Sequence, residues 1–357
     1  MKKVLVAMSG GVDSSVSAFL LKKQGYECIG CTMKLYGNED IGTSGGHTCC
    51  SLSDVEDARS VAYRLGIPYY VFNYSEEFRE KVIGRFVCEY RAGRTPNPCI
   101  DCNRFMKFDL LYRRAKILGC DFVATGHYAR ITAENGVYCL KKGADETKDQ
   151  SYVLYPLGRE ALAHTLFPLG SLRKSEVRKI AGENGFLNAE KPDSQDICFV
   201  PDGDYAKAVE RFGGQPLPAG DFVDRNGTVL GRHKGIVRYT VGQRKGLGIS
   251  AAEPLYVCQT RPASNEIVLG KKQDLLSSGM TVKDVTWLLS DIPTEPQRCR
   301  VKIRYRGQEY ACTVRPLADR TVSVLFDEPA KAVTPGQSAV FYREDTVLGG
   351  GIIDFGF

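Results

Sequence analysis

The sequence predicts an α/β domain with a parallel sheet, then a small β-rich central domain, then a C-terminal antiparallel β-barrel. Three observations support this. Strand and helix patterns alternate at the start of the chain, short strand patterns broken by turn residues follow, and apolar and polar residues alternate towards the end. A chain of 357 residues is long enough for two or three domains. We therefore expect domains over residues 1–205, 206–280 and 281–357.

Composition and charge are those of an ordinary folded protein. The chain is 43% hydrophobic and 25% charged, and its net charge of +6 permits an anionic partner without requiring one. We find neither an export signal nor an apolar stretch long enough to span a membrane, so we expect a cytoplasmic protein. An odd number of cysteines, 13, favours reduced thiols over a disulfide framework.

The first element is an apolar strand over residues 3–8. The loop S-G-G-V-D-S at residues 9–14 follows, and then a helix that ends near Gly25. Glycines between a strand and a helix let backbone N–H groups approach a phosphate, and the helix dipole favours negative charge there. The loop lacks both the lysine of a Walker A motif and a G-x-G-x-x-G pattern. The loop therefore predicts an anion-binding site that differs from both the Walker A and the dinucleotide-binding type.

The later elements follow from the same patterns. In the first domain we expect strands over 26–35, 69–72 and 121–125 and helices over 53–65 and 105–118. The central domain has strand patterns at 257–259 and 267–270. The barrel of five or six strands includes 299–306, 310–316, 321–326 and 338–343, with Arg300, Lys302, Arg304 and Arg306 on one face of the first of these strands.

Two segments place cysteines beside polar, turn-forming residues. They are T-P-N-P-C-I-D-C-N at 95–103 and P-D-S-Q-D-I-C-F at 192–199. Zinc binding by Cys28, Cys31 and the pair at 49–50 is disfavoured, because the spacing is wrong and the first two lie in a predicted strand. We expect the remaining cysteines to be small buried hydrophobes. These are Cys28, Cys88, Cys120, Cys139, Cys258, Cys299 and Cys312.

Eight ordered motifs resemble the bacterial tRNA-specific 2-thiouridylase family, which belongs to the PP-loop ATP pyrophosphatases. They are the loop at 9–14, TPNPCIDCNR (95–104), ATGHYAR (124–130), KDQSYVLY (148–155), DSQDICFV (193–200), YTVGQRKGLGI (239–249), TPGQSAVFY (334–342) and LGGGII (348–353). The resemblance covers nearly the whole chain. It implies an N-terminal PP-loop domain, similar to adenine nucleotide α-hydrolases, and ATP-dependent 2-thiolation of the wobble uridine in tRNAs for Lys, Glu and Gln.

The resemblance also implies a two-step reaction with two cysteines. ATP converts the C2 oxygen of the uridine into an adenylate, and sulfur then displaces AMP. Cys198 would carry the sulfur as a persulfide, and Cys102 would be the nucleophile that releases it and closes a transient disulfide with Cys198. Because the thiolate is the reactive form, we expect the pKa of at least one of these two thiols to be depressed by the positive charge of Arg104 or Lys107. A cysteine desulfurase or a sulfur-relay protein would supply the sulfur.

The same resemblance implies the binding residues. ATP contacts would come from Ala7, Met8, Ser9, Gly10, Gly11, Val12, Asp13, Ser14, Met33 and Gly126, with Asp13 able to assist Mg²⁺. The target base would meet Asn97, Pro98 and Cys99. Contacts with the rest of the tRNA would come from His127, Lys148, Asp149, Gln150, Arg304, Tyr305 and Gln337.

One residue departs from the family pattern. The family commonly has aspartate where this chain has Cys99. The chain therefore lacks, at this position, the carboxyl group that could act as a general acid or base in the family. Cys99, Cys102 and Cys198 also form a three-thiol set similar to that of iron–sulfur-dependent tRNA thiolases, which is one alternative.

Two further alternatives remain open at this point. Another PP-loop ATP pyrophosphatase could amidate or condense a small molecule, and such an enzyme would not need the cysteine pair. A non-catalytic RNA-binding protein with a vestigial nucleotide fold would release no pyrophosphate in the presence of tRNA.

Overall fold

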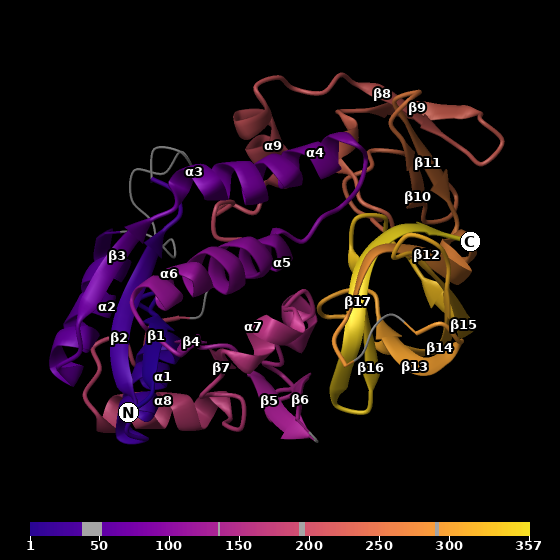
Figure 1. Cartoon of the computed structure of the whole chain (residues 1–357). Helices are drawn as coiled ribbons and strands as arrows, with labels where there is room; N and C mark the ends of the chain where they lie inside the picture. The colour runs from indigo at the N-terminus through magenta and orange to yellow at the C-terminus, as the bar shows by residue number, and fades with distance from the viewer. Residues whose placement is uncertain (38–51, 135, 193–196, 290–292) are drawn as a thin grey trace. The chain divides into compact units, whose positions relative to one another are not determined.

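The computed structural model describes residues 1–37, 52–134, 136–192, 197–289 and 293–357 (Figure 1). Their contacts form two compact units. The first contains Met1–Val82, Cys99–Gly203 and Asp345–Val347, and the second contains Ile83–Pro98, Asp204–Glu344 and Leu348–Phe357. A short segment early in the chain thus belongs to the same unit as the C-terminal half. The predicted domain boundaries near 205 and 280 stay a prediction.

The first unit is built on a sheet of five strands, which is parallel as predicted. Its order is β3-β2-β1-β4-β7. The strands are β1 (Lys3–Ala7), β2 (Glu27–Lys34), β3 (Tyr69–Asn73), β4 (Phe122–Ala124) and β7 (Thr165–Leu166). β1 is central in this order, so the loop that follows it opens at the middle of the sheet's carboxyl edge, where ligands of α/β folds bind.

Helices cover both faces of this sheet. Val4 and Val6 of β1 pack on one face with α1 (Val12–Lys23), α2 (Leu52–Leu65) and α8 (Lys174–Glu183). Leu5 points to the opposite face and packs with α6 (Leu111–Ile117). This alternation follows from the two-residue period of a strand, and it buries β1 on both sides.

The helix predicted over 105–118 begins earlier, at Pro98. It runs from α5 (Pro98–Asp101) through a π-helical stretch, η2 (Cys102–Leu110), into α6. Proline suits the first turn of a helix, because its φ is already helical and its missing N–H has no partner to lose there. The predicted turn around the cysteines is therefore a helix start.

Several short elements of the first part of the chain were not predicted. The hairpin β5 (Ala129–Glu134) and β6 (Val137–Lys142) follows β4. The others are α3 (Ser75–Phe78), η1 (Arg79–Gly84), α4 (Arg85–Arg91), η3 (Ser151–Leu154) and α7 (Arg159–Ala163).

The second unit contains a small four-stranded sheet in the order β10-β11-β8-β9. Its strands are β8 (Gly220–Val223), β9 (Val229–His233), β10 (Tyr256–Arg261) and β11 (Glu266–Gly270). The short helices near it in sequence are α9 (Tyr205–Gly213), η4 (Ile236–Arg238) and η5 (Lys272–Leu275). Phe222, Val257 and Ile267 are fully buried. The β-rich central region is thus confirmed.

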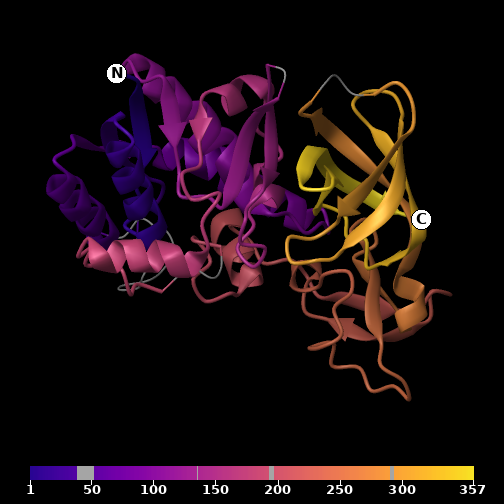
Figure 2. The ribbon, with the colours of Figure 1, turned by 90° about the horizontal axis from the view of Figure 1, so that it is seen from below.

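The C-terminal barrel is also confirmed, with six antiparallel strands (Figure 2). They are β12 (Leu276–Trp287), β13 (Gln297–Lys302), β14 (Glu309–Pro316), β15 (Val322–Lys331), β16 (Ser338–Arg343) and β17 (Thr346–Gly356). Pairing of β12 with β17 closes the barrel. Val301, Val324, Phe341 and Ile353 are among the fully buried residues of its core.

The strand predicted over 299–306 is too long. β13 ends at Lys302, and the chain then turns, with the Gly307 N–H donating to the Arg304 carbonyl at 3.0 Å. Arg304 and Arg306 therefore do not share a strand face with Arg300 and Lys302. Among the described residues, no helix is both long enough and apolar enough to cross a membrane.

Candidate active site

The loop after β1 is a tight turn held by its own side chains. The backbone N–H of Ser9 donates to Ser14 Oγ at 3.1 Å, and that hydroxyl donates to the Gly11 carbonyl at 3.0 Å. Gly10 has a φ of 73°, and a Cβ there would overlap the carbonyl oxygen of Asp54 on α2. Position 10 therefore requires glycine for its conformation and for its close approach to α2.

Two of the segments predicted to bind ATP lie side by side. A Cβ on Gly126, just after β4, would come within 2.9 Å of the Asp13 carbonyl carbon and 3.0 Å of the Ser14 nitrogen. The absence of a side chain at Gly126 thus lets this segment pack closely against the start of α1. Met8 is buried, and Met33 of β2 packs partly buried against the core that contains Leu5.

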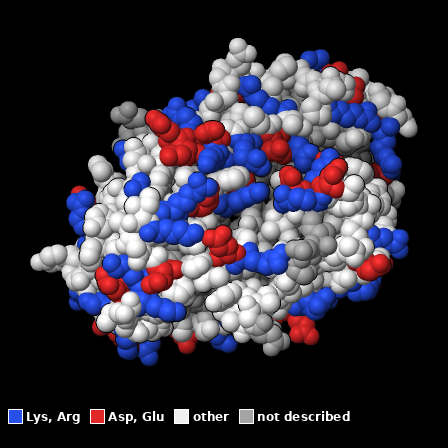
Figure 3. Space-filling view, in the orientation of Figure 1, with Lys and Arg blue, Asp and Glu red and all other residues white. Residues whose placement is uncertain are grey.

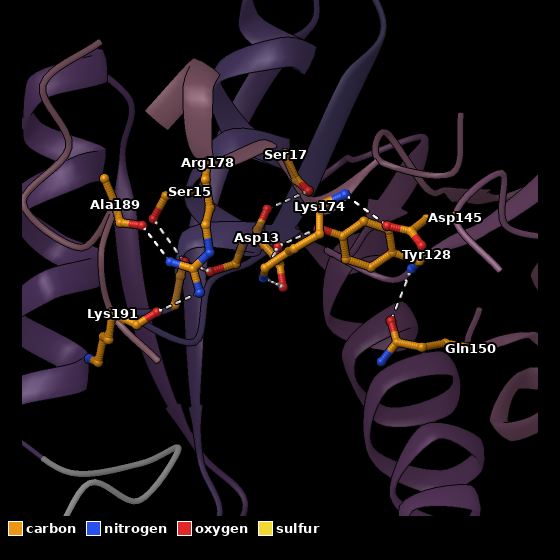
Figure 4. A network of polar contacts seen from close by, with 12 residues as sticks. Asp13, Ser15, Ser17, Tyr128, Asp145, Gln150, Lys174, Arg178, Ala189 and Lys191 are labelled. Atoms are coloured by element: carbon orange, nitrogen blue, oxygen red, sulfur yellow. Dashed lines mark hydrogen bonds and ion pairs between the residues drawn. The ribbon is translucent and has the colours of Figure 1, made fainter. Parts of the chain in front are cut away.

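Asp13 is the centre of a polar network (Figure 4). Lys174, the first residue of α8, donates from Nζ to both carboxylate oxygens of Asp13 at 2.8 Å. The Tyr128 hydroxyl donates to Oδ1 at 2.7 Å. Only 11% of the Lys174 side chain is exposed. The network places a shielded cation beside the start of α1, where the helix dipole also favours an anion.

Our sequence reasoning missed Lys174 and Tyr128. Tyr128 lies inside the A-T-G-H-Y-A-R motif, next to residues that were considered, so the motif itself was a usable signal. Lys174 is 161 residues away from Asp13, and nothing in its own helix distinguishes it from a surface lysine. Only the fold brings it to the loop.

A second group of side chains holds the other side of the loop. Asn188 Nδ2 donates to the Gly10 carbonyl and to Ser15 Oγ, both at 2.9 Å. Lys191 contacts Asp54 and Asp57 of α2 at 2.6 Å each. Burial opposes the charge of Lys191, but its hydrogen bonds to these carboxylates outweigh burial and raise its pKa. The loop is thereby fixed to α2 before any nucleotide binds.

His127 is buried rather than presented to solvent. Its Nδ1 is 2.6 Å from Thr125 Oγ1, and its Nε2 is 3.4 Å from Lys107 Nζ. Burial and the charge of Lys107 lower the pKa of His127 well below its usual value, so the imidazole is neutral. Its ring contacts Phe108 and Phe167, which also contact each other. The contact with tRNA implied for His127 stays a prediction.

The segment 148–150 is well organised. Asp149 accepts hydrogen bonds from the backbone N–H groups of Gly143 and Ser151 and from the Ser151 hydroxyl. The Gln150 side-chain oxygen accepts from the Tyr128 N–H at 2.9 Å. The Lys148 N–H donates to the Asp145 carbonyl at 3.0 Å. The contacts with tRNA implied for this segment stay predictions.

The three cysteines of the predicted sulfur chemistry all belong to the first unit. Cys99 is exposed within α5, and Cys102 begins η2 with intermediate exposure. Cys198 is also of intermediate exposure, and its carbonyl accepts from the Tyr36 hydroxyl at 2.9 Å. Residues 193–196 lie outside the described residues. The transient disulfide of Cys102 with Cys198 stays a prediction.

The burial expected for the remaining cysteines is only partly correct. Cys28, Cys120, Cys139 and Cys312 are buried, and burial raises the pKa of Cys28 to about 11. Cys88 is instead exposed in α4, and Cys258 and Cys299 are of intermediate exposure. The cysteines at 49 and 50 lie outside the described residues.

Residues predicted to contact the tRNA in the second unit bind other parts of that unit. Arg304 donates from Nη2 to the Val241 carbonyl at 2.8 Å and to Thr334 Oγ1 at 2.6 Å. The Gln337 side-chain amide donates to the Thr95 carbonyl at 2.7 Å, two residues before Asn97. Tyr305 follows Arg304 in the turn after β13. These groups organise the protein, and their contact with RNA stays a prediction.

The residues proposed for an iron–sulfur cluster do not form a metal site in the described part of the chain. No group of three or more His, Cys, Asp or Glu side chains is arranged there to hold a metal ion. We therefore derive no step through a cluster. Lys and Arg side chains lie interspersed with Asp and Glu side chains on the face shown in Figure 3.

Three family models match successive parts of the chain. The tRNA methyl transferase HUP domain matches residues 2–202, the tRNA methyl transferase PRC-barrel domain matches 209–271, and the aminomethyltransferase β-barrel domain matches 277–353. The tRNA-specific 2-thiouridylase MnmA of Clostridioides difficile is 51% identical over 99% of this chain and 98% of that protein. The chain belongs to the tRNA-specific 2-thiouridylase family.

Other members of the 2-thiouridylase family are equally similar. The protein of Lachnoclostridium phytofermentans is 50% identical over 99% of both chains. The protein of Geobacter metallireducens is 51% identical over 99% of this chain and 97% of its own. The similarity therefore extends over both units.

Proposed function

We propose that this chain is a tRNA-uridine 2-sulfurtransferase. It uses ATP to replace the C2 oxygen of the wobble uridine in tRNAs for Lys, Glu and Gln with sulfur. The observation that carries this proposal is the combination, in one unit, of a glycine-lined anion loop with a buried lysine and two partly exposed cysteines on different segments. The names of the full-length relatives support the same substrate.

The first step is adenylation of the uridine. The C2 oxygen attacks the α-phosphate of ATP, and pyrophosphate leaves. Backbone N–H groups of residues 10–14 and the Lys174 ammonium stabilise the negative charge on the phosphates. Mg²⁺ would bind together with ATP, coordinated by its phosphates, because this ion usually keeps several waters and takes only one or two protein carboxylates. Asp13 is the carboxylate available in this loop.

The second step transfers sulfur. A persulfide on Cys198 attacks C2 with its terminal sulfur, and AMP leaves with the original oxygen. The Cys102 thiolate then attacks Sγ of Cys198, which leaves the terminal sulfur on the uridine and forms a Cys102–Cys198 disulfide. A dithiol reductant restores both thiols by supplying two electrons. A cysteine desulfurase or a sulfur-relay protein reloads Cys198, and the reaction takes place in the cytoplasm.

Cys99 takes no proton-transfer role in this proposal. It stands where relatives commonly have aspartate, and a thiol ordinarily titrates several pH units above a carboxyl group. We assign it only to the neighbourhood of the target base, together with Asn97 and Pro98.

Methyl transfer, which the names of two of the matching domain families mention, fits this site less well. A methyl donor of the S-adenosylmethionine type carries a positive sulfonium and no phosphate. The start of α1 and the buried Lys174 instead form a site for an anion. The residues therefore favour a nucleoside triphosphate.

The test is a comparison of cysteine variants. Cys102→Ser and Cys198→Ser are expected to abolish 2-thiouridine, measured by mass spectrometry of digested tRNA, while ATP binding is retained. Cys88→Ser, which changes an exposed cysteine of α4, is the matched control and keeps full activity. Full thiolation by either of the first two variants would contradict the proposal.

A further inference from the structure

Asp13 of the nucleotide loop is connected to the loop of residues 145–150 by two separate routes (Figure 4). One route passes through Tyr128 and the other through Lys174. All the contacts lie within the first unit. Since the loop 145–150 contains the segment assigned to tRNA, these routes join the place where ATP is held to the place where RNA is expected.

The first route uses both ends of Tyr128. The Tyr128 hydroxyl donates to Asp13 Oδ1 at 2.7 Å. Its backbone N–H donates to the Gln150 side-chain oxygen at 2.9 Å, and its carbonyl accepts from the Gln150 N–H at 2.9 Å. Tyr128 is only 3% exposed, so its ring has little freedom to move independently of these bonds. A displacement of Gln150 is therefore transmitted to the hydroxyl.

The second route uses the start of α8. The Lys174 backbone N–H donates to Asp145 Oδ2 at 3.0 Å, while the Lys174 ammonium binds both oxygens of Asp13. Hydrogen bonds from Thr147 and Lys174 lower the pKa of Asp145, so this carboxylate stays ionised and keeps its hold on the start of α8. The loop 145–150 thus positions the lysine as well as the tyrosine.

We propose that Tyr128 is a positioning residue that makes ATP cleavage depend on bound tRNA. This inference rests on the proposed function and deepens it. To contact the triphosphate, the Lys174 ammonium must give up part of its contact with the Asp13 carboxylate. The Tyr128 hydroxyl keeps Asp13 partnered during this exchange, because it still donates to Oδ1 when the lysine turns towards the triphosphate. RNA bound at Gln150 sets the position of Tyr128 and so controls the exchange.

The Gln150 side chain can contact bound RNA and Tyr128 at the same time. Its side-chain oxygen is committed to Tyr128, whereas its side-chain nitrogen donates to no residue in the described ranges. The amide can therefore donate to an RNA acceptor without giving up the bond to Tyr128. One side chain then contacts both the substrate and the positioning residue.

The first experiment compares Tyr128→Phe with wild type. Tyr128→Phe removes only the hydroxyl, so we expect the tRNA-dependent stimulation of pyrophosphate release to fall at least fivefold, the lower end of ordinary coupling between sites. The dissociation constants of ATP and tRNA, measured separately, should change less than about threefold, which is about 0.65 kcal/mol. Tyr112→Phe is the matched control, because its hydroxyl contacts Glu160 and not the nucleotide loop.

A second pair of variants separates the two roles of Gln150. Gln150→Glu keeps an acceptor for the Tyr128 N–H but removes the donor, so it should raise the KM for tRNA and keep the stimulation at saturating tRNA. Gln150→Met keeps the length but removes both the donor and the acceptor, so it should raise the KM for tRNA and also lose the stimulation at saturating tRNA. A purely structural role would instead give parallel losses in both variants.

The outcomes distinguish this inference from the proposed function. If wild type releases pyrophosphate equally well with and without tRNA, the proposed function and this inference both fall. If wild type is stimulated by tRNA and Tyr128→Phe is stimulated to the same extent, only this inference falls. Unfolding temperatures of the variants within a few degrees of wild type establish that each loss is local.

Discussion

The largely buried ammonium group of Lys174 supplies positive charge to the nucleotide site. We predict that Lys174→Met lowers the rate of tRNA-dependent pyrophosphate release about 100-fold, because one fixed electrostatic contact at a reacting phosphate is typically worth that much. The rate is measured in single turnovers at saturating ATP. Lys179→Met is the control, since Lys179 lies on the same helix with its side chain 75% exposed. An equal loss in both variants would contradict the assignment.

Gly126 tests the close approach of β4 to the nucleotide loop. A methyl group at this position would overlap the backbone of Asp13, so Gly126→Ala should cost about 1–3 kcal/mol, as other overpacked sites do. We expect this cost to appear as weaker ATP binding in calorimetry. Gly158→Ala is the control, because no atom lies within 4 Å of its added Cβ. Unchanged ATP affinity in Gly126→Ala would show that the two segments do not form one site.

Single residues also show where prediction from sequence succeeds and where it stops. The loop at 9–14 could be located because its glycines and its place after a strand are local features. Lys174 could not be located, because its relation to Asp13 exists only after α8 has packed against α1. Arg304 and Gln337 were assigned to RNA, and no local pattern shows that each donates to a distant carbonyl.

At the scale of elements, β9 contains a histidine that sets a pH dependence. His233 is 1% exposed, its Nδ1 accepts from the Gly235 N–H, and its Nε2 donates to the Asn265 carbonyl. Burial lowers the pKa of His233, so the folded protein keeps it neutral while the unfolded chain takes up a proton below about pH 6.5. Stability contributed by this residue is present above that pH and is lost on acidification.

We therefore predict that the free energy of unfolding of the unit with β9 falls as the pH decreases from 7 to 5. His233 takes up at most one proton on unfolding, so it contributes at most about 1.4 kcal/mol per pH unit to the slope of the free energy of unfolding against pH. His233→Gln can still donate and accept hydrogen bonds but does not titrate. It should reduce the slope of the free energy of unfolding against pH by up to this contribution, measured by urea unfolding at each pH. A variant with the wild-type slope would show that His233 is not the titrating group.

The junction of the turn after β13 with the central region gives another prediction. Arg304 donates to the Val241 carbonyl and to Thr334, so Arg304→Ala should lower the free energy of unfolding by about 1–3 kcal/mol. Arg306→Ala, two residues on and exposed, is the control and should be neutral in thermal unfolding. Equal stability of the two variants would show that these Arg304 hydrogen bonds do not stabilise the fold.

Elements were predicted well where one pattern decides them. β16 matches its predicted range because its short apolar run is bounded by turn residues on both sides. The helix around Cys102 was missed at its start, because Thr-Pro-Asn-Pro reads as a turn although proline also begins helices. β13 was predicted too long, because the alternation continues past Lys302 while the backbone turns.

At the scale of the whole molecule, the fold class follows from the order of its patterns, whereas its grouping into units does not. Residues 83–98 join the C-terminal half because Arg94 binds Asp354 and Thr95 binds Pro335 and Gln337. These partners are more than 200 residues away in sequence. Local periodicity contains no information about such pairs.

The central claim is that ATP activates the uridine oxygen itself. The direct test is the thiolation reaction in water enriched in oxygen-18, with AMP and 2-thiouridine measured by mass spectrometry. We predict one unlabelled AMP for each 2-thiouridine formed, because the oxygen gained by the α-phosphate comes from C2 of the uridine. AMP that contains oxygen-18 in proportion to 2-thiouridine would show attack by water, and would contradict the account.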